Sequence, residues 1–140
     1  MTFGEMNRAL AQVGASVSVD LETGAVTLKP GREPLPLELI EAAKIHKQNF
    51  YTGARIQSKY NEYRQRCAVN YKPGALKILS DRYPVIRKQL DEVGEAACKP
   101  WADWRESGGP FDLFFFEQLL AAWTDVWDQA LALVEDAVHE

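Results

Sequence analysis

The spacing of apolar residues changes twice in the first third of the chain, and these changes restrict the folds open to it. Over residues 3–13 an apolar residue recurs every three or four positions, which predicts a short amphipathic helix. Over residues 16–28 apolar and polar residues alternate, and Glu22-Thr23-Gly24 divides the run, which predicts a β-hairpin. Helical spacing returns after a proline-containing loop at residues 29–36. This order predicts an α+β fold, because a two-stranded hairpin is stable only when it rests on helices or on a partner.

Helical spacing continues through the rest of the chain, and prolines and glycines divide it into segments. We expect helices over residues 36–67, 75–82, 84–99 and 111–138, with Thr52-Gly53 as an optional break in the first and Lys99-Pro100 as the end of the third. The predicted fold class is therefore α+β and mostly α. A helix–β-hairpin–helix module at residues 1–53 precedes a helical bundle at residues 54–140 that ends in a long helix. One continuous domain is the alternative to this division.

Charged residues are sorted along the sequence. Residues 1–43 hold three Lys or Arg and six acids, residues 44–88 hold eleven Lys or Arg and two acids, and residues 89–140 hold two Lys or Arg and twelve acids. The formal net charge of −4 conceals this pattern. Such sorting predicts either a charged partner or parts of the chain that neutralise each other.

Common catalytic and metal-binding motifs are absent from the sequence, which contains no H-E-x-x-H, no C-x-x-C and no glycine-rich phosphate-binding motif. Cys67 and His46 offer a nucleophile–base pair, but a free cysteine on an amphipathic helix is usually a packed residue. The second histidine, His139, is next to the last residue. We therefore expect no catalytic residues, no metal site and no cofactor.

The cellular setting is predicted from three further features of the sequence. Its first residues lack a basic segment followed by an apolar one, and no apolar run approaches the ~20 residues of a membrane span. Two cysteines do not make a disulfide framework. These features predict a small soluble protein of the cytoplasm with reduced thiols and no membrane partner.

In addition to the hairpin residues, two sets of side chains could contact a partner. Arg55, Lys59 and Arg66 form a basic stripe on their predicted helix, which suits nucleic acid or an acidic partner, with a solvated helix face as the alternative. Aromatic residues in the acidic part exceed what one helix face needs, which predicts an oligomer or partner interface, with a bundle core as the alternative. The candidate interface aromatics are Trp101, Trp104, Phe114, Phe115, Trp123 and Trp127.

Three pieces of the first 50 residues follow the pattern of a known family. They are a helix at Met6–Gly14, a hairpin at Ser16–Leu28, and a helix that opens Leu35-Pro36-Leu37-Glu38-Leu39 and carries Ala43-Lys44-Ile45-His46-Lys47. On these residues, about 50 of 140, the chain resembles the TubC-type N-terminal docking domains of polyketide and nonribosomal peptide synthetases. In that family the hairpin and the adjoining helix capture a short, often acidic peptide, and the modules are often dimeric. The resemblance implies peptide capture at the hairpin edge.

The function that we expect is non-catalytic: a docking, adaptor or regulatory protein that binds a protein or peptide, with self-association through the aromatic helix as a second contact. The alternative is a nucleic-acid-associated accessory protein, or a host-defence inhibitor of a phage or mobile element, that uses the basic residues 44–88. The residues expected to contact a peptide partner are Val17, Val19, Val26 and Leu28 on the hairpin and Lys44 and Lys47 beyond it.

Overall fold

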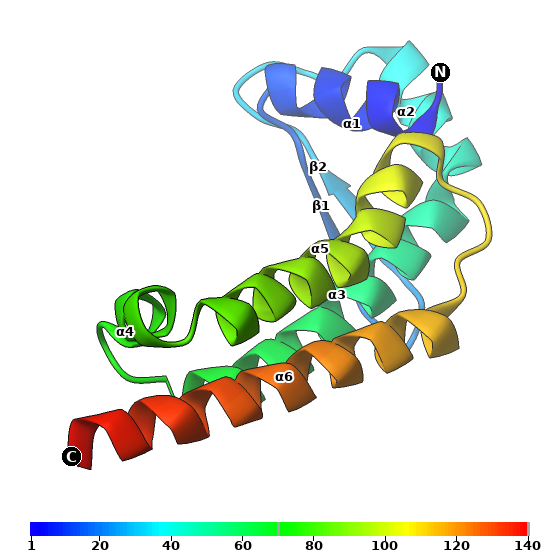
Figure 1. Cartoon of the computed structure of the whole chain (residues 1–140). Helices are drawn as coiled ribbons and strands as arrows, with labels where there is room; N and C mark the ends of the chain where they lie inside the picture. The colour runs from blue at the N-terminus through cyan, green and yellow to red at the C-terminus, as the bar shows by residue number, and fades with distance from the viewer. Residues whose placement is uncertain (70, 140) are drawn as a thin grey trace. The chain divides into compact units, whose positions relative to one another are not determined.

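The structure is a computed structural model that describes residues 1–69 and 71–139, without the side chains at positions 68, 69 and 139. Its described part is mostly helical, with one two-stranded antiparallel hairpin near the start (Figure 1). The predicted α+β, mostly α fold class is therefore confirmed, including the helix–hairpin–helix start and the long last helix. The elements are α1 (Phe3–Gln12), β1 (Ser16–Val19), β2 (Val26–Lys29), α2 (Leu37–Ile45), α3 (Lys47–Val69), α4 (Ala75–Arg82), α5 (Pro84–Ser107) and α6 (Leu113–His139).

The chain forms two compact units. Unit 1 contains Met1–Ser58 and Trp101–Phe111, and unit 2 contains Lys59–Pro100 and Asp112–Glu140. Helices α3 and α5 each contribute residues to both units. The division predicted at residue 53 did not group residues 101–111 with the first part of the chain. In the structure these residues belong to unit 1.

The hairpin of unit 1 follows directly from the alternation in the sequence. Val17 lies opposite Leu28, and Val19 lies opposite Val26, so these four side chains share one face of the sheet. All four are half-buried, whereas the residues between them are exposed. Gly24 ends the turn with a φ of 76°, a conformation that glycine adopts without steric cost. The hairpin therefore buries one apolar face within its own unit.

The break between α2 and α3 falls at His46, while Thr52 and Gly53 lie inside α3. The sequence left open whether the helix breaks at Thr52-Gly53 or continues, and in the structure it continues. A side chain at this glycine would approach the ring of Trp104 to about 3.1 Å, so the glycine permits a close approach within unit 1. The break at His46 was not predicted, because the apolar spacing continues across it.

Helix α5 does not end at Lys99-Pro100, and this expectation from the sequence was wrong. The helix continues to Ser107 with Pro100 inside it, so Trp101 and Trp104 are helical. An interior proline removes a hydrogen bond and costs about 3 kcal/mol or more. Burial of the two indoles in the core of unit 1 offsets this cost, since Trp101 is 8% exposed and Trp104 is 5% exposed.

The core of unit 1 is an aromatic cluster around Phe3 of α1. The ring of Phe3 meets those of Phe50 and Trp104 edge-on, with a centroid separation of 5.3 Å in each case. Edge-on pairs of this kind add stability beyond the area that they bury. Residues from α1, α3 and the end of α5 are thereby held in one small core.

Unit 2 has a separate apolar core in which α4 packs on α6. Val126, Ala130 and Val134 recur every four residues along α6 and are buried, as expected for one face of an amphipathic helix. Helix α6 begins after Asp112, whose side chain accepts a hydrogen bond from the backbone N–H of Phe115 at 2.9 Å. The start predicted at residue 111 is therefore close to the observed one.

Candidate binding sites

Two predicted contact residues lie in one hollow of unit 1. Lys44 from the end of α2 and Lys47 from the start of α3 line a hollow of about 510 Å³, together with Gly24 of the hairpin turn. Ile45 lies between the two lysines in the sequence and is 80% exposed at the same hollow. Within the described part of the chain, neither lysine has an ion-pair partner. We call this set, completed by Gln48 and Tyr51, the lysine hollow.

His46 fixes the turn between the two helices that carry these lysines. Its Nε2 donates to the backbone carbonyl oxygen of Met1 at 3.1 Å, and its Nδ1 accepts from the side-chain amide of Asn49 at 2.9 Å. Both ring nitrogens are thus engaged within unit 1, whereas Cys67 belongs to unit 2. These two hydrogen bonds hold the His46 ring in place at the break between α2 and α3.

The predicted hairpin residues divide into two pairs. Val17 and Val19 of β1 line a groove of about 560 Å³, whose other walls come from α1, α3 and the end of α5. Val26 and Leu28 share their face of the sheet but are not among the groove residues. Strand β1 pairs only with β2 among the described residues, so its other edge carries no neighbouring strand. We call the space beside β1 the edge groove.

The predicted basic stripe is largely occupied by internal contacts. Lys59 pairs with Glu62 at 3.3 Å and with Glu117 at 3.4 Å. The pKa of Lys59 is raised, mainly by its hydrogen bond to Glu62. Arg66 pairs with the same Glu62 at 3.1 Å. Arg55 lies over a neighbouring tyrosine ring, 5.9 Å from its centroid. Two members of the stripe are therefore neutralised by carboxylates of unit 2.

Other basic residues between positions 44 and 88 are also paired. Together with Lys59 and Arg66, at least five of the eleven have a carboxylate within 4 Å. The further pairs are Lys72 with Glu135, Arg87 with Asp91 and Lys88 with Glu92. The sorting of charge along the sequence thus becomes, in part, neutralisation within unit 2.

The six candidate interface aromatics occupy three different environments. Trp101 and Trp104 are buried in unit 1, where the indole N–H of Trp104 donates to the carbonyl of Gly109 at 2.9 Å. These two residues therefore belong to a core, as the alternative stated, and do not form an exposed interface, because residues of their own unit cover both rings. Phe114 is 72% exposed and Phe115 is 49% exposed at the start of α6, so both can contact a partner.

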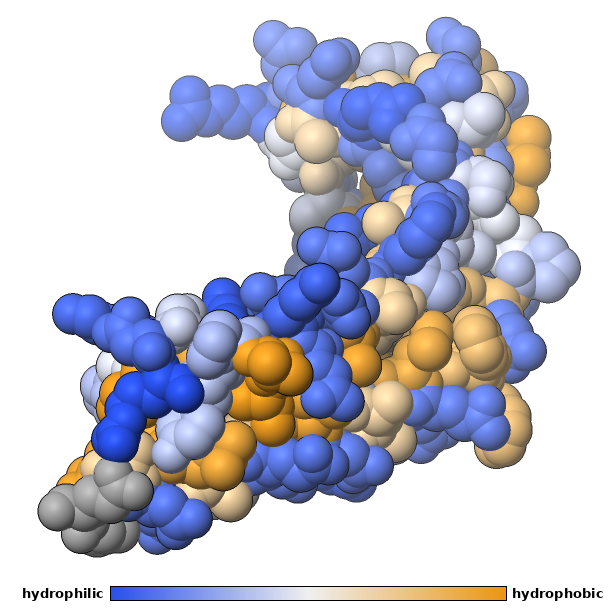
Figure 2. Space-filling view, viewed as in Figure 1, coloured by the Kyte–Doolittle hydropathy of each residue, from blue (hydrophilic) through white to orange (hydrophobic). Residues whose placement is uncertain are grey.

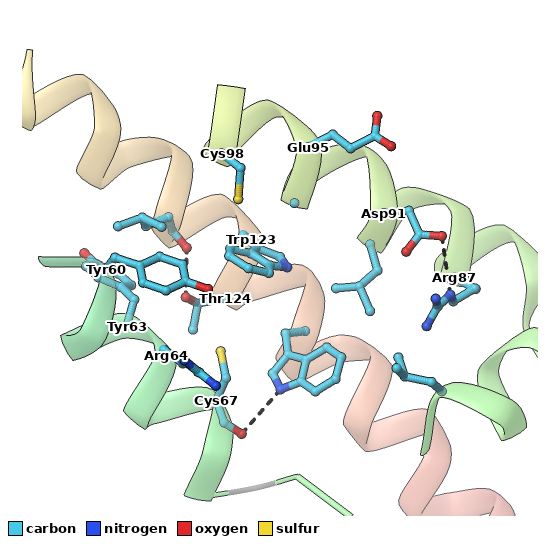
Figure 3. A pocket seen from close by; sticks show the side chains of 15 residues that line it. Tyr60, Tyr63, Arg64, Cys67, Arg87, Asp91, Glu95, Cys98, Trp123 and Thr124 are labelled. Atoms are coloured by element: carbon cyan, nitrogen blue, oxygen red, sulfur yellow. Dashed lines mark hydrogen bonds and ion pairs between the residues drawn. The ribbon is translucent and has the colours of Figure 1, made fainter. Parts of the chain in front are cut away.

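Trp123 and Trp127 line a groove in unit 2, and this site was not predicted as a whole. The groove has a volume of about 760 Å³ and lies among α3, α5 and α6, with one residue from α4 (Figure 3). Tyr60 lies beside Trp123 with a centroid separation of 6.3 Å. We call this site the aromatic groove. Figure 2 shows apolar side chains exposed among polar ones over the helices of this unit.

Cys67 and Cys98 face the aromatic groove from α3 and α5. Cys67 is half-buried, and burial is the main cause that raises the pKa of its thiol, while a hydrogen bond with Thr124 acts in the opposite direction. Its backbone carbonyl accepts a hydrogen bond from the indole N–H of Trp127 at 3.4 Å. Cys98 is exposed and is the more accessible thiol.

Several residues that line the aromatic groove were not predicted from the sequence, including Arg64, Gly94 and Cys98. The one available sign was a glycine inside the helical pattern of residues 84–99, which often marks a close contact. Residues from three helices meet here, and helix spacing alone does not show which faces meet.

Among the described residues, no three His, Cys, Asp or Glu side chains are grouped so as to hold a metal ion. None of the helices in the described ranges combines the length and the apolar character that crossing a bilayer requires. His139, named in the sequence analysis, has a side chain outside the described part. Comparison with protein families, curated proteins and solved structures gives no match to this chain.

Proposed function

We propose that unit 1 is a non-catalytic docking module that receives a short acidic peptide segment of another protein. The observation that carries this proposal is the lysine hollow, where Lys44 and Lys47 flank the exposed Ile45 beside the hairpin turn. Two ammonium groups without ion-pair partners in the described chain attract carboxylates, and an exposed apolar side chain between them offers contact area. A peptide with acids on either side of an apolar residue matches this pattern.

The edge groove supplies a path for the rest of such a peptide. An extended segment can add to the unpaired edge of β1 through main-chain hydrogen bonds, and its alternate side chains can enter the groove beside Val17 and Val19. The resemblance of the first 50 residues to TubC-type docking domains supports the same mode of binding. The role would be that of an adaptor or regulatory protein that works through contacts.

The internal pairing of basic residues makes a phosphate-binding role less favourable than peptide docking. A nucleic-acid surface gains affinity by releasing counterions from phosphates, and an arginine or lysine already paired with a carboxylate contributes less to this gain. Lys59 and Arg66 are paired in this way. The lysine hollow keeps its charge uncompensated, and it is therefore the more favourable site for an anionic partner.

A peptide selection with charge-reversal variants tests the docking proposal. A displayed library of random short peptides is selected on the full chain, and the affinity of the selected peptides is measured by fluorescence anisotropy. We expect acidic peptides with an apolar residue between the acids, and a loss of affinity of about tenfold or more in Lys44→Glu/Lys47→Glu. The matched control is Lys77→Glu/Lys88→Glu, which makes the same charge change in unit 2 and should leave affinity unchanged.

Two results would contradict the proposal. One is a set of selected peptides without acidic character. The other is unchanged affinity in the double variant at positions 44 and 47 while its thermal unfolding matches that of the wild type. The second result would remove the lysine hollow as the docking surface even if a peptide binds elsewhere.

A further inference from the structure

We propose that the aromatic groove of unit 2 binds a small flat aromatic molecule that carries one anionic group. This site is distinct from the docking surface of unit 1, because every residue that lines it belongs to unit 2. Its volume of about 760 Å³ lies in the range of about 300–1,000 Å³ that small-molecule sites occupy. The ligand class follows from the rings, the open space and the hydrogen-bond donors of the groove.

Aromatic rings form much of the groove surface. Trp123 and Trp127 come from α6, and Tyr60 and Tyr63 come from α3 (Figure 3). Flat rings of this kind gain stacking energy with an aromatic ligand in addition to the area that is buried. Aliphatic side chains, such as Leu90, contribute a smaller share of the lining. A planar ring system is therefore the shape that the groove favours.

Gly94 lines the groove where the Trp123 ring lies close to α5. A Cβ atom at this position would lie 3.4 Å from the indole, in contact with it, so a larger side chain would crowd the ring. An interior helical glycine costs roughly 0.5–1 kcal/mol relative to alanine. Helix α5 carries this cost at a position that borders the aromatic surface, where a larger side chain would cover or displace the Trp123 ring.

The groove has hydrogen-bond donors at the α3 side and at the indole, and the carboxylate of Glu95 lies on the opposite side, on α5. The guanidinium of Arg64 and the Nε1–H of Trp123 have no partner among the described residues. Of the lining acids, Asp91 is paired with Arg87 at 3.4 Å, and Glu95 is exposed on α5. An anionic oxygen near Arg64 would accept from a charged donor that forms two parallel bonds readily. The charge of the ligand is thus expected at the α3 side.

A matched pair of fluorescent probes tests this assignment. Anilinonaphthalene sulfonate (ANS) is an aromatic anion with a flat naphthalene ring, and phenylnaphthylamine has the same rings without the sulfonate. Each probe is titrated into the full-length protein, and binding is followed by probe fluorescence and by energy transfer from tryptophan. We expect ANS to bind more tightly than phenylnaphthylamine, with energy transfer that is reduced in Trp123→Phe/Trp127→Phe, where Trp101 and Trp104 remain as donors. Equal affinity for the two probes would contradict the proposed role of charge.

Three further variants locate the site. Arg64→Gln should weaken ANS binding about five- to tenfold and leave phenylnaphthylamine binding unchanged. Gly94→Leu should weaken both probes at least about tenfold, because the leucine fills the space beside Trp123. Lys77→Gln is the control, since it makes the same charge change in unit 2 at a residue that does not line the groove. An effect of Lys77→Gln equal to that of Arg64→Gln, or full binding by Gly94→Leu, would contradict the assignment.

A measurement on the unaltered protein separates specific binding from loss of structure, since ANS also binds partly folded chains. Cys98 is an exposed thiol that lines the groove, so a bound molecule should shield it. We expect saturating ANS to slow alkylation of Cys98 by iodoacetamide several-fold, as read by mass spectrometry. An unchanged alkylation rate would place the probe elsewhere, including on a surface that binds a partner helix, and would overturn the proposal.

Discussion

Arg8 and Glu106 are 98 residues apart in the sequence and form a bidentate ion pair, with both nitrogen–oxygen distances at 2.8 Å. The pair joins α1 to the last turn of α5 within unit 1. Both side chains remain more than half exposed, so water and salt screen their attraction. Its value to the fold lies in position: it ties the returning segment of residues 101–111 to the first helix.

Stability of unit 1 should depend on pH through this pair. The hydrogen bond from Arg8, followed by its charge, holds the pKa of Glu106 below its ordinary value. Because the folded pKa is lowered, the contribution is fully present above the unfolded pKa and is lost as the pH falls through the folded pKa. Glu106→Gln should therefore lower the Tm slightly at pH 7 and leave it unchanged in acid.

Thermal unfolding across this pH range, with Glu33→Gln as the control, checks the prediction. Glu33 is an exposed acid without an ion-pair partner in the described chain, so its replacement should shift the Tm equally little at every pH. If Glu106→Gln lowers the Tm by the same amount at neutral and at acidic pH, the ion pair does not stabilise unit 1.

The glycine pair after α5 should respond unequally to alanine. Gly108 and Gly109 have φ values of 67° and 89°, and an alanine in this region costs about 1–2 kcal/mol. At Gly108 the new Cβ would also meet the side chain of Asn49, whose Oδ1 accepts from the backbone N–H of Gly109 at 2.9 Å. Loss of that hydrogen bond adds about 1 kcal/mol.

Urea unfolding of the two single variants measures this difference. Gly109→Ala carries only the backbone cost, because nothing lies near its Cβ position. We expect Gly108→Ala to lower the free energy of unfolding by about 1 kcal/mol more than Gly109→Ala. Equal effects would mean that Asn49 moves aside without loss, and that its bond to the turn contributes little.

Neighbouring phenylalanines at the start of α6 should have opposite roles. Phe116 is 1% exposed, so Phe116→Ala should destabilise by about 3–5 kcal/mol. Phe114→Ser/Phe115→Ser removes exposed rings and should change the free energy of unfolding by about 0.5 kcal/mol or less per site. If these two rings hold copies of the chain together, light scattering should show a dimer in the wild type and a monomer in the double variant. A wild-type monomer would contradict the predicted self-association.

The parts of the fold that could be predicted from the sequence are those whose signals are local. Alternation of apolar and polar residues gave the hairpin at 16–29, and Pro84 marks the start of α5 because proline suits a first helical turn. Local signals failed at two positions. The helices break at His46, whose ring is hydrogen-bonded to Met1 and Asn49, and α5 continues through Pro100 to bury Trp101 and Trp104.

The candidate sites were less predictable than the fold, because each combines residues from several elements. Lys44 and Lys47 were identified from the charge and the family pattern, but their position beside Gly24 depends on the turn at His46. The aromatic groove depends on which faces of α3, α5 and α6 meet, and periodicity shows only that each helix has an apolar face. Pairing of Lys59 with Glu117 joins residues that are distant in the sequence.

That pairing leads to a prediction for the nucleic-acid alternative. Because carboxylates neutralise Lys59 and Arg66, the protein should pass through a heparin column at physiological salt. Glu62→Gln/Glu117→Gln releases both basic residues and should increase retention, with elution that shifts to higher salt. Glu5→Gln/Glu33→Gln makes the same charge change in unit 1 and serves as the control. Strong retention of the wild type, with binding that falls steeply as salt rises, would instead favour a phosphate-binding role for Arg55, Lys59 and Arg66.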